Sequence, residues 1–252
     1  MMSSRYKNKI AIITGGADGI GKAVAYRLGK EGAAVALFDI NENLLQATIE
    51  EFEKEGIKAK GYLTDISNET QVSESVVQVE KEWQGIDVLV HAAGIVGPTN
   101  IKITNYPTAD FNKVYEVNLK GTFLITKYTL KVMEKIGEGR ILLIASIAGK
   151  EGNPGMLGYS STKAGVIGLV KAVAKEFATT NITVNGLAPA VIKTSINANT
   201  APEQLAYMTA KIPMQRLGTV EEVAAMCCFI VSEENSFSTG FIYDISGGRA
   251  TY

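Results

Sequence analysis

A short apolar segment that leads directly into a glycine-rich loop and then into a helical pattern constrains the fold of this chain most. Residues 9–14 (KIAIIT) are apolar and rich in β-branched side chains, as in a buried parallel strand. Glycines follow at Gly15, Gly19 and Gly21, and apolar residues at helical spacing begin at Ile20. Glycine lets the backbone approach a pyrophosphate closely, and a helix N-terminus supplies unpaired N–H groups. This order predicts a dinucleotide-binding loop, with a tight structural turn as the alternative.

Segments of strand length alternate with amphipathic helical patterns along the whole chain, without repeats or a linker. Further strands are expected at residues 33–38, 57–63, 86–92, 139–145, 183–187 and 241–245. Further helices are expected at residues 42–55, 72–83, 111–135 (as one helix or two), 221–232 and from Tyr159 onward. This alternation predicts an α/β fold, a single Rossmann-type doubly wound parallel sheet with helices on both faces, formed by residues 1–252. Ligands of such sheets bind beyond the carboxyl ends of the strands.

Three connecting segments lack a clear strand or helix pattern. Residues 97–108 contain two prolines and residues 149–158 are rich in glycine, which indicates loops. Residues 192–213 have weak periodicity and many Asn, Ala and Thr residues. Because an irregular segment of that length inside a compact domain is most often a lid, residues 190–213 are predicted to cover the ligand site.

The acidic residue at the end of the second strand predicts which dinucleotide the chain prefers. Asp39 lies about 20 positions after the glycines, where a carboxylate binds a ribose diol. The same charge repels a 2′-phosphate, and neither Ala17 nor Ile40 supplies a compensating positive charge. NAD is therefore the expected cofactor, rather than NADP. In the alternative, Asp39 caps the next helix, although Asn41 could do so instead.

Two further polar residues each have a functional and a structural interpretation. Asp65, at the carboxyl end of a predicted strand, is placed to contact an adenine amino group or to cap the helix that follows. Asn118 lies among apolar neighbours in a predicted helix, where its amide satisfies core hydrogen bonds or serves a site.

A tyrosine and a lysine four positions apart open one of the predicted helices. Tyr159 and Lys163 therefore lie on one helix face, about one turn from each other. A nearby ammonium favours the phenolate and lowers the pKa of a phenol from its usual value of about 10. Such a pair can move protons at neutral pH. The alternative is an exposed tyrosine ring that stacks on the lysine stem.

Composition excludes several classes of function. The formal net charge of −1 gives no electrostatic basis for binding nucleic acid or an anionic membrane. No apolar run approaches the roughly 18 residues of a membrane span, and residues 1–9 lack the apolar stretch of a signal peptide. One histidine (His91) and two adjacent cysteines (Cys227 and Cys228) are too few for a transition-metal site and poorly placed for a disulfide. A small-molecule substrate, no metal and a cytoplasmic location are expected.

Motifs spread over residues 9–248 resemble, in order, those of the short-chain dehydrogenase/reductase family. The matching residues are Thr14, Gly15, Gly19, Ile20, Gly21, Ala92, Ala93, Gly94, Asn118, Ser146, Tyr159, Lys163, Pro189 and Thr194. The YxxxK spacing alone is a weak signal and the GxxxGxG spacing a moderate one, whereas the complete ordered set is highly specific. The resemblance implies a Rossmann-type fold, usually tetrameric, that transfers hydride between a nicotinamide and a carbonyl or secondary alcohol.

The resemblance also implies roles for individual residues. Tyr159 would be the general acid/base, and Ser146 would hydrogen-bond the reacting oxygen. Lys163 would lower the pKa of Tyr159 and bind the nicotinamide ribose, while Asn118 would hold a water that links Lys163 to solvent. The residues expected at the cofactor are Gly15, Asp18, Gly19, Ile20, Gly21, Asp39, Ile40, Asp65, Ile66, Ala92, Ala93, Gly94, Tyr159, Lys163, Pro189, Ile192 and Thr194.

Two positions depart from the family pattern. His91-Ala92-Ala93-Gly94 stands where the family usually has Asn-Asn-Ala-Gly. His91 is therefore expected to replace an asparagine structurally, by hydrogen-bonding nearby backbone, rather than to act in catalysis. Ala190 stands where a glycine usually follows the proline, and neither change removes a catalytic residue.

The C-terminal segment, residues 236–252, resembles that of sugar-acid and polyol dehydrogenases, as do residues 189–192. This implies a polyhydroxylated substrate such as a 2-keto-3-deoxy sugar acid, with NAD as oxidant. A 3-oxoacyl-(acyl-carrier-protein) reductase is the alternative, although that activity usually runs on NADPH. A non-catalytic NAD(H)-binding regulator is the remote alternative. Arg249 is expected at the surface. In the alternative, Arg249 pairs with a substrate carboxylate, in its own active site or in that of a neighbouring subunit.

Overall fold

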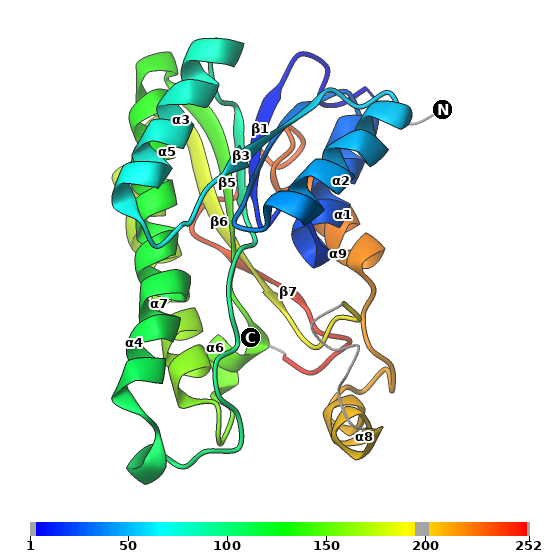
Figure 1. Ribbon diagram of the computed structural model, residues 1–252, viewed down its shortest axis with the longest axis vertical. Coiled ribbons are helices and arrows are strands. Elements are labelled where there is room, and N and C mark those ends of the chain that lie inside the picture. The colour runs from blue at the N-terminus through cyan, green and yellow to red at the C-terminus, as the bar shows by residue number, and fades with distance from the viewer. Residues whose placement is uncertain (1–3, 195–201, 251–252) are drawn as a thin grey trace.

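Seven parallel strands form one sheet in the computed structural model, which describes residues 4–194 and 202–250 (Figure 1). The strands are β1 (Ile10–Thr14), β2 (Ala34–Asp39), β3 (Ala59–Leu63), β4 (Val88–His91), β5 (Glu138–Ile144), β6 (Asn181–Pro189) and β7 (Ile242–Ile245). Their order is β3-β2-β1-β4-β5-β6-β7. The order reverses between β1 and β4, which is where such sheets open a crevice at the carboxyl ends of the strands. The predicted doubly wound α/β sheet is confirmed.

Helices cover both faces of this sheet, as Figure 1 shows. One face carries α1 (Gly19–Lys30), α2 (Glu42–Lys54) and α9 (Val220–Ile230). The other carries α3 (Glu69–Trp83), α5 (Gly121–Ile136) and α7 (Leu157–Glu176). The shorter elements are α4 (Thr108–Tyr115), α6 (Ile147–Glu151), α8 (Pro202–Ala210), a 3-10 helix at Ile103–Asn105 and a π-helix at Glu116–Lys120.

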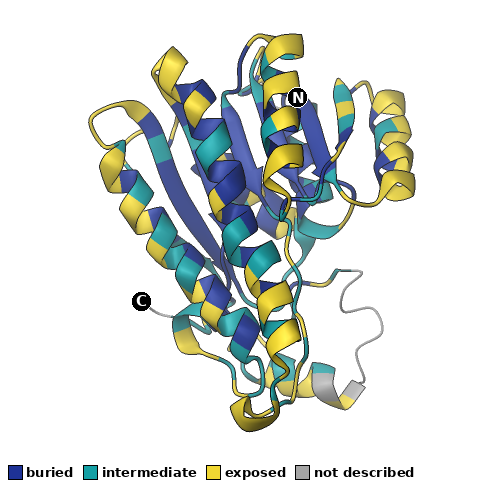
Figure 2. Ribbon diagram, turned by 60° about the vertical axis from the view of Figure 1, so that its left-hand side comes forward, coloured by how far each residue is buried: buried dark blue, intermediate teal, exposed yellow. Residues whose placement is uncertain are grey.

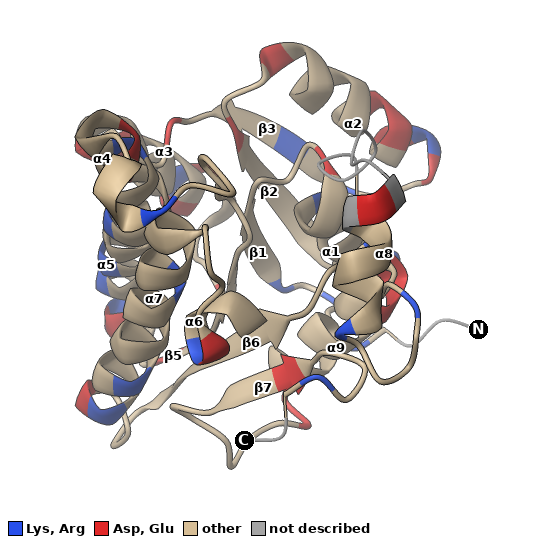
Figure 3. Ribbon diagram, turned by 90° about the horizontal axis from the view of Figure 1, so that it is seen from below, with Lys and Arg blue, Asp and Glu red and all other residues tan. Residues whose placement is uncertain are grey.

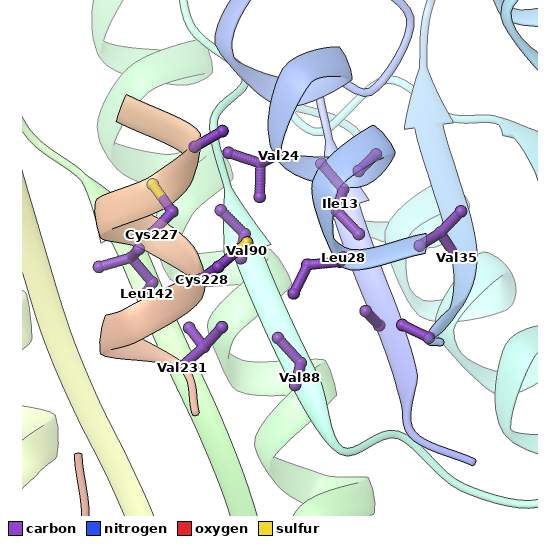
Figure 4. Packing of buried hydrophobic residues seen from close by; sticks show 14 of the residues in the cluster. Ile13, Val24, Leu28, Val35, Val88, Val90, Leu142, Cys227, Cys228 and Val231 are labelled. Carbon is purple, nitrogen blue, oxygen red and sulfur yellow. The ribbon is translucent and has the colours of Figure 1, made fainter. Parts of the chain in front are cut away.

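Each face of the sheet has its own buried apolar cluster, because alternate side chains of a strand point to opposite faces. On one face, Val90 of β4 packs in a cluster with Leu28 of α1 and Cys227 of α9 (Figure 4). On the other face, Leu89 belongs to a cluster that contains Val170 of α7. The helices bury the sides that face the sheet and expose the opposite sides (Figure 2). This pattern is the one that the amphipathic spacing predicts.

Most expected elements form with shifted ends, and local contacts account for the shifts. The third helix begins at Glu69 rather than at residue 72, because the Asn68 side chain accepts a hydrogen bond from the Gln71 N–H and so caps the helix. The sixth strand runs on to Pro189 rather than ending at residue 187, because its last residues pair with β7.

The loops predicted at residues 97–108 and 149–158 and the irregular lid are each wrong in part. The 3-10 helix lies in the first loop, and the last turn of α6 occupies the start of the second. Within the predicted lid, residues 202–210 form α8. Residues 195–201 of that lid lie outside the described residues. The expected helix at residues 111–135 forms as α4, the π-helix and α5 in direct succession.

None of the helices in the described ranges combines the length and hydropathy that crossing a bilayer requires. Within the same ranges, no three His, Cys, Asp or Glu side chains are grouped so that they could hold a metal ion.

A buried carboxylate ties the N-terminal segment to α1 and makes stability depend on pH. Glu31 accepts hydrogen bonds from Arg5 (2.7 Å) and from Arg27. Burial by itself would raise the pKa of Glu31, but the hydrogen bonds from the two arginines outweigh it and lower the pKa from 4.5. A carboxyl whose folded-state pKa is lowered stabilises the fold above its unfolded-state pKa, and this contribution is lost as the pH falls.

Replacing Glu31 with glutamine is therefore expected to lower the free energy of unfolding at pH 7 by about 1–3 kcal/mol. The difference from wild type should shrink as the pH falls below 4.5, because the wild-type carboxyl then becomes protonated. Urea denaturation at pH 7 and at lower pH measures both effects. Glu51→Gln removes an exposed pair with Lys22 (2.6 Å) and should cost less than about 1 kcal/mol. Equal losses in the two variants would contradict the prediction.

Candidate active site

The residues expected to bind and react gather around the carboxyl ends of the central strands, on the side of the molecule seen in Figure 3. The glycine loop follows β1, Ala92 follows β4, Ser146 lies just beyond β5, and Pro189 ends β6. Parallel strands present these ends along one edge, so residues far apart in the sequence become neighbours.

The Ser146 hydroxyl lies close enough to the Tyr159 phenol to influence its pKa. Ser146 has an extended backbone and caps α6, because its Oγ accepts a hydrogen bond from the Ala148 N–H at 3.1 Å. Tyr159 lies in the first turn of α7 and is half-buried. Burial raises the pKa of the Tyr159 phenol, and the hydrogen bond from Ser146 opposes that rise. The Ser146 hydroxyl and the Tyr159 phenol are thus neighbours in the site.

Lys163 is a buried cation one turn along α7 from Tyr159. Its Nζ lies 5.8 Å from the centroid of the Tyr159 ring and donates a hydrogen bond of 2.7 Å to the carbonyl oxygen of Ile144. Only 6% of Lys163 is exposed, and burial lowers the pKa of its ammonium to about 8. Because Lys163 is buried, the predicted alternative of an exposed tyrosine on a lysine stem does not describe this pair.

Asn118 lies in the π-helix, and its side chain holds the segment after β4. Its Oδ1 accepts from the Ile95 N–H and its Nδ2 donates to the Ile95 carbonyl oxygen, both at 2.8 Å. Nδ2 also lies 3.3 Å from Thr162 Oγ1. Single π turns inside α-helices recur at functional sites. The amide thus satisfies buried hydrogen bonds, and it does so beside Lys163, since a Cβ added to Gly94 would lie 3.1 Å from Asn118 Oδ1 and 3.6 Å from Lys163 Nζ.

The loop after β1 requires glycine at two positions. Gly15 has φ +64°, and an added Cβ would lie 3.0 Å from the Ala93 backbone. A Cβ on Gly21 would lie 2.0 Å from the Gly15 carbonyl oxygen, which is far inside van der Waals contact. The first turn of α1 therefore packs directly on the loop. Asp18 caps this helix by accepting a 2.7 Å hydrogen bond from the Gly19 N–H, and Ile20 is half-buried behind it.

Asp39 lies at the end of β2 next to the glycine loop. Its Oδ2 accepts from the Ala17 N–H at 3.1 Å, and its Oδ1 accepts from the Asn41 N–H at 3.0 Å. The following helix is capped by Asn41, whose side chain accepts from the Leu44 N–H, so Asp39 is not the cap. Ile40 is exposed beside it. Both carboxylate oxygens of Asp39 thus lie beside the glycine loop and hold backbone N–H groups.

Asp65 and Ile66 follow β3 and have different surroundings. Asp65 Oδ1 accepts from the N–H and the hydroxyl of Ser67, and Asn68 caps the next helix, so Asp65 does not cap it. The Ile66 side chain is buried and packs against Gly121.

Pro189, Ile192 and Thr194 lie beyond the end of β6. Ile192 is buried and forms an isolated bridge with Gly218. The segment then turns back toward the glycine loop, where a Cβ added to Gly19 would lie 3.7 Å from the Thr194 side chain. Thr194 and Gly19 are thus neighbours, although 175 positions separate them in the sequence.

Two sequence predictions are corrected by the structure. His91 does not bond nearby backbone through its ring, because Nδ1 contacts the Thr14 hydroxyl at 2.7 Å. Arg249 is not a surface residue. Its side chain is 7% exposed and donates to Glu151 at 2.8 Å and to Asn153 at 3.0 Å in the same chain.

Thr14 and Lys150 had no role assigned from the sequence. The Thr14 hydroxyl accepts hydrogen bonds from the N–H groups of Ala92 and Ala93, both at 3.2 Å. A threonine as the last residue of a buried strand is the signal that points to such a contact. Lys150 of α6 pairs with Asp244 of β7 at 2.8 Å, and this contact has no local signal because 94 positions separate the two. Figure 3 shows α6 and β7 on this side of the molecule.

Residues 15–250 match a protein family described as Enoyl-(Acyl carrier protein) reductase. Among curated proteins, the chain is 42% identical over 252 residues to 2-dehydro-3-deoxy-L-rhamnonate dehydrogenase (NAD(+)) of Sphingomonas sp. (strain SKA58), covering all of this chain and 99% of that protein. It is also 37% identical over 244 residues to the 3-oxoacyl-[acyl-carrier-protein] reductase of Thermotoga maritima, covering 97% of this chain and 98% of that one.

Solved structures of similar proteins share the whole fold. The chain aligns with NAD+-bound xylitol dehydrogenase at a TM-score of 0.92 and 30% identity, covering 97% of this chain and 100% of that one. It aligns with a variant of actinorhodin polyketide ketoreductase with NADPH at a TM-score of 0.91 and 31% identity, covering both chains in full.

Proposed function

The chain belongs to the short-chain dehydrogenase/reductase family, and we propose that it oxidises a secondary alcohol of a sugar acid or polyol. It is an NAD-dependent oxidoreductase that acts on CH–OH groups. The neighbouring side chains of Ser146 and Tyr159 beside the Lys163 ammonium carry the proposal, because a reacting oxygen needs a proton acceptor and a second donor within reach. The substrate class, of the 2-keto-3-deoxy sugar acid type, is supported by the full-length similarity to the rhamnonate dehydrogenase.

We assign the roles as follows. In oxidation the Tyr159 phenolate takes the proton of the substrate hydroxyl, and Ser146 donates a hydrogen bond to the same oxygen. Lys163 holds a positive charge that favours the phenolate. Asn118 keeps the segment at Ile95 in place beside Lys163 and holds the water that links Lys163 to solvent. NAD+ supplies the hydride acceptor when bound. In the reducing direction Tyr159 returns its proton to the carbonyl oxygen.

The loop after β1 fits a dinucleotide. A Cβ at Gly15 or Gly21 would meet the backbone of Ala93 or of Gly15, so glycine at both positions lets the loop pack tightly against the N-terminus of α1, whose N–H groups suit a pyrophosphate. Asp39, at the end of β2 beside this loop, would accept hydrogen bonds from the ribose diol. The other residues assigned to the cofactor are Asp18, Gly19, Ile20, Ile40, Asp65, Ile66, Ala92, Ala93, Gly94, Pro189, Ile192 and Thr194, together with Tyr159 and Lys163.

A Gly21→Ala variant is expected to bind NADH about 10- to 100-fold more weakly, because its methyl group forces the Gly15 carbonyl and the loop out of place. Fluorescence titration with NADH gives the dissociation constant. Gly168→Ala is the matched control, since Gly168 lies in α7 and a Cβ there meets nothing within 4 Å. The control should bind NADH as the wild type does. Unchanged binding by Gly21→Ala would refute the assigned loop.

An Asp39→Asn variant should lose most of the preference for NAD over NADP. The amide keeps one oxygen that can accept from the N–H of Ala17 or of Asn41, but it no longer carries the charge that repels a 2′-phosphate. We expect the ratio of kcat/KM with NAD+ to kcat/KM with NADP+ to fall by about tenfold or more. Asp65→Asn, near the adenine, should leave this ratio unchanged. Equal turnover of both cofactors by the wild type would contradict the assignment.

A 3-oxoacyl-(acyl-carrier-protein) reductase is the second candidate, because relatives with that name are 37% and 36% identical to the chain. A screen of NAD+ reduction over sugar acids, polyols and 3-hydroxyacyl thioesters separates the two. Turnover of a sugar acid or polyol supports the proposal, and turnover of the thioesters alone overturns it. Tight NADH binding without turnover of any substrate would instead indicate a regulator.

We propose that the protein is a cytoplasmic homotetramer, in which residues 1–252 form one domain and the segment 190–213 covers the substrate. The aromatic side chains of Phe237 and Phe241, exposed at the C-terminal end, are compatible with burial against another copy. Light scattering coupled to size-exclusion chromatography measures the subunit count, and a monomeric mass would refute the assembly.

A further inference from the structure

The side chains of Thr14 and His91 meet at the junction of the two central strands. They are aligned across the sheet in the β1–β4 pairing, and Thr14 Oγ1 lies 2.7 Å from His91 Nδ1. Both are buried, with Thr14 at 0% and His91 at 2% exposure. The same Oγ1 lies 3.2 Å from the N–H groups of Ala92 and Ala93. One hydroxyl thus makes three contacts.

Counting donors and acceptors favours one arrangement of the protons. A hydroxyl has one proton to donate and two lone pairs to accept with. The N–H groups of Ala92 and Ala93 both donate to this oxygen and so take up its two lone pairs, and the Ala92 N–H shares its hydrogen with the Thr14 carbonyl oxygen at 3.3 Å. The Thr14 hydroxyl then donates its hydrogen bond to His91 Nδ1, which can accept it only if that nitrogen carries no hydrogen. A neutral imidazole with a bare Nδ1 carries its hydrogen on Nε2.

The surroundings of the ring keep it neutral. His91 pairs with Leu143 in the sheet, and Lys163 Nζ donates to the carbonyl oxygen of the next residue, Ile144. Burial, and after it the charge of Lys163, lower the pKa of His91 to about 3. A protonated ring would also bring a third donor to Thr14 Oγ1, which has no lone pair left for it.

The Nε2 atom of His91 is buried and has no hydrogen-bond partner among the described residues. Since a buried donor without a partner is costly, few are retained in folded proteins, and each calls for a reason. The close approach of Gly15 to Ala93 suggests such a reason. The glycine loop packs against Ala93, and the Thr14 hydroxyl holds the Ala93 amide at that place.

We propose that Thr14 locks His91 as its neutral Nε2–H tautomer, and that the locked ring is a positioning residue for the cofactor loop. His91 Nδ1 accepts a hydrogen bond from the Thr14 hydroxyl. Both lone pairs of that hydroxyl can then accept from the amides after β4 and hold them against the loop after β1. The ring contributes no charge and no proton transfer. Its effect on cofactor binding passes through Thr14, and this part of the inference rests on the proposed NAD-dependent function.

The first test needs no activity. The chain has one histidine, so protein grown with ¹⁵N-histidine gives NMR signals from the ring nitrogens of His91 alone. We expect one hydrogen-bearing nitrogen, assigned to Nε2, one bare nitrogen, and no titration between pH 5 and pH 9. In Thr14→Val the bare-nitrogen signal should shift, because Nδ1 loses its donor. A ring that titrates between pH 5 and pH 8, or that carries its hydrogen on Nδ1, overturns the lock.

The second test asks whether the lock positions the cofactor loop. Thr14→Val and His91→Phe should each raise the dissociation constant of NADH about 3- to 10-fold. The double variant should lose less than the product of the single losses, since both act through one hydrogen-bond network. His91→Asn, whose amide oxygen can accept from Thr14, should recover most of the affinity.

The outcomes of the second test are separable. Independent, multiplicative losses, or unchanged NADH binding together with a lowered free energy of unfolding, would reduce His91 to a purely structural residue and overturn the positioning role. If the wild type itself failed to bind NADH, the proposed function would fail, while the NMR result would still decide the tautomer.

Discussion

A Tyr159→Phe variant is expected to lose about 10²- to 10⁴-fold in kcat for alcohol oxidation, the usual contribution of a positioned acid/base. The phenol oxygen lies near the Ser146 hydroxyl, and removing it takes away the group that we assign to accept the substrate proton. The ring remains, so packing at the start of α7 and NADH binding should change little. Steady-state kinetics on a substrate found in the screen measures the loss.

Tyr26→Phe is the matched control for this prediction. Tyr26 also carries a hydroxyl that contacts one side chain, Glu55 at 3.4 Å, but on the outer surface of α1. Its loss should leave kcat unchanged. Wild-type turnover by Tyr159→Phe on the same substrate would remove Tyr159 from the reaction and with it the proposed mechanism.

The sheet and the glycine loop follow from patterns that are local in the sequence. Residues 9–14 read as a buried strand by composition alone, and β1 forms at Ile10–Thr14. The need for glycine at Gly15 and Gly21 follows from the strand–loop–helix order, and the structure shows its steric reason. The adjacency of Tyr159 and Lys163 is likewise fixed by helical spacing.

What the sequence could not provide depends on contacts between distant segments. The five residues of α6 are too short for a periodic pattern, and the helix exists because Ser146 caps it after β5 has delivered that residue. The partner of His91 is set by the alignment of β4 beside β1, 77 positions apart. Arg249 pairs with Glu151, which is 98 positions away in the sequence. No local pattern indicates that contact, so a surface position was the natural expectation for this arginine.

The charge on Lys163 has a cost in stability that its function explains. Burial lowers the pKa of this ammonium from 10.5 to about 8, which means that the folded state holds the proton less tightly than the unfolded chain does. Below pH 8 this penalty is fully present, and it disappears as the pH rises through 10.5. A Lys163→Met variant should therefore be more stable than the wild type at pH 7, by up to about 3 kcal/mol.

The same variant should be the less active one. With Lys163 present, the rate of oxidation should rise with pH near 8, because the pair of Tyr159 and Lys163 loses its first proton there. Without Lys163, no ammonium helps Tyr159 to lose its proton, and burial raises the pKa of the phenol. We expect the rising limb of the kcat/KM profile to move to higher pH, with a loss of about 100-fold or more at pH 7.

Lys171→Met, an exposed lysine two turns further along α7, is the control and should leave the pH profile unchanged. A Lys163→Met variant with the wild-type profile would mean that the ammonium does not act on Tyr159. A variant that is both less stable and less active, with an unshifted profile, would make Lys163 a packing residue. Higher stability together with a shifted profile is the combination that only a charge held for catalysis explains, since removing a merely structural lysine would not move the pH at which the phenol reacts.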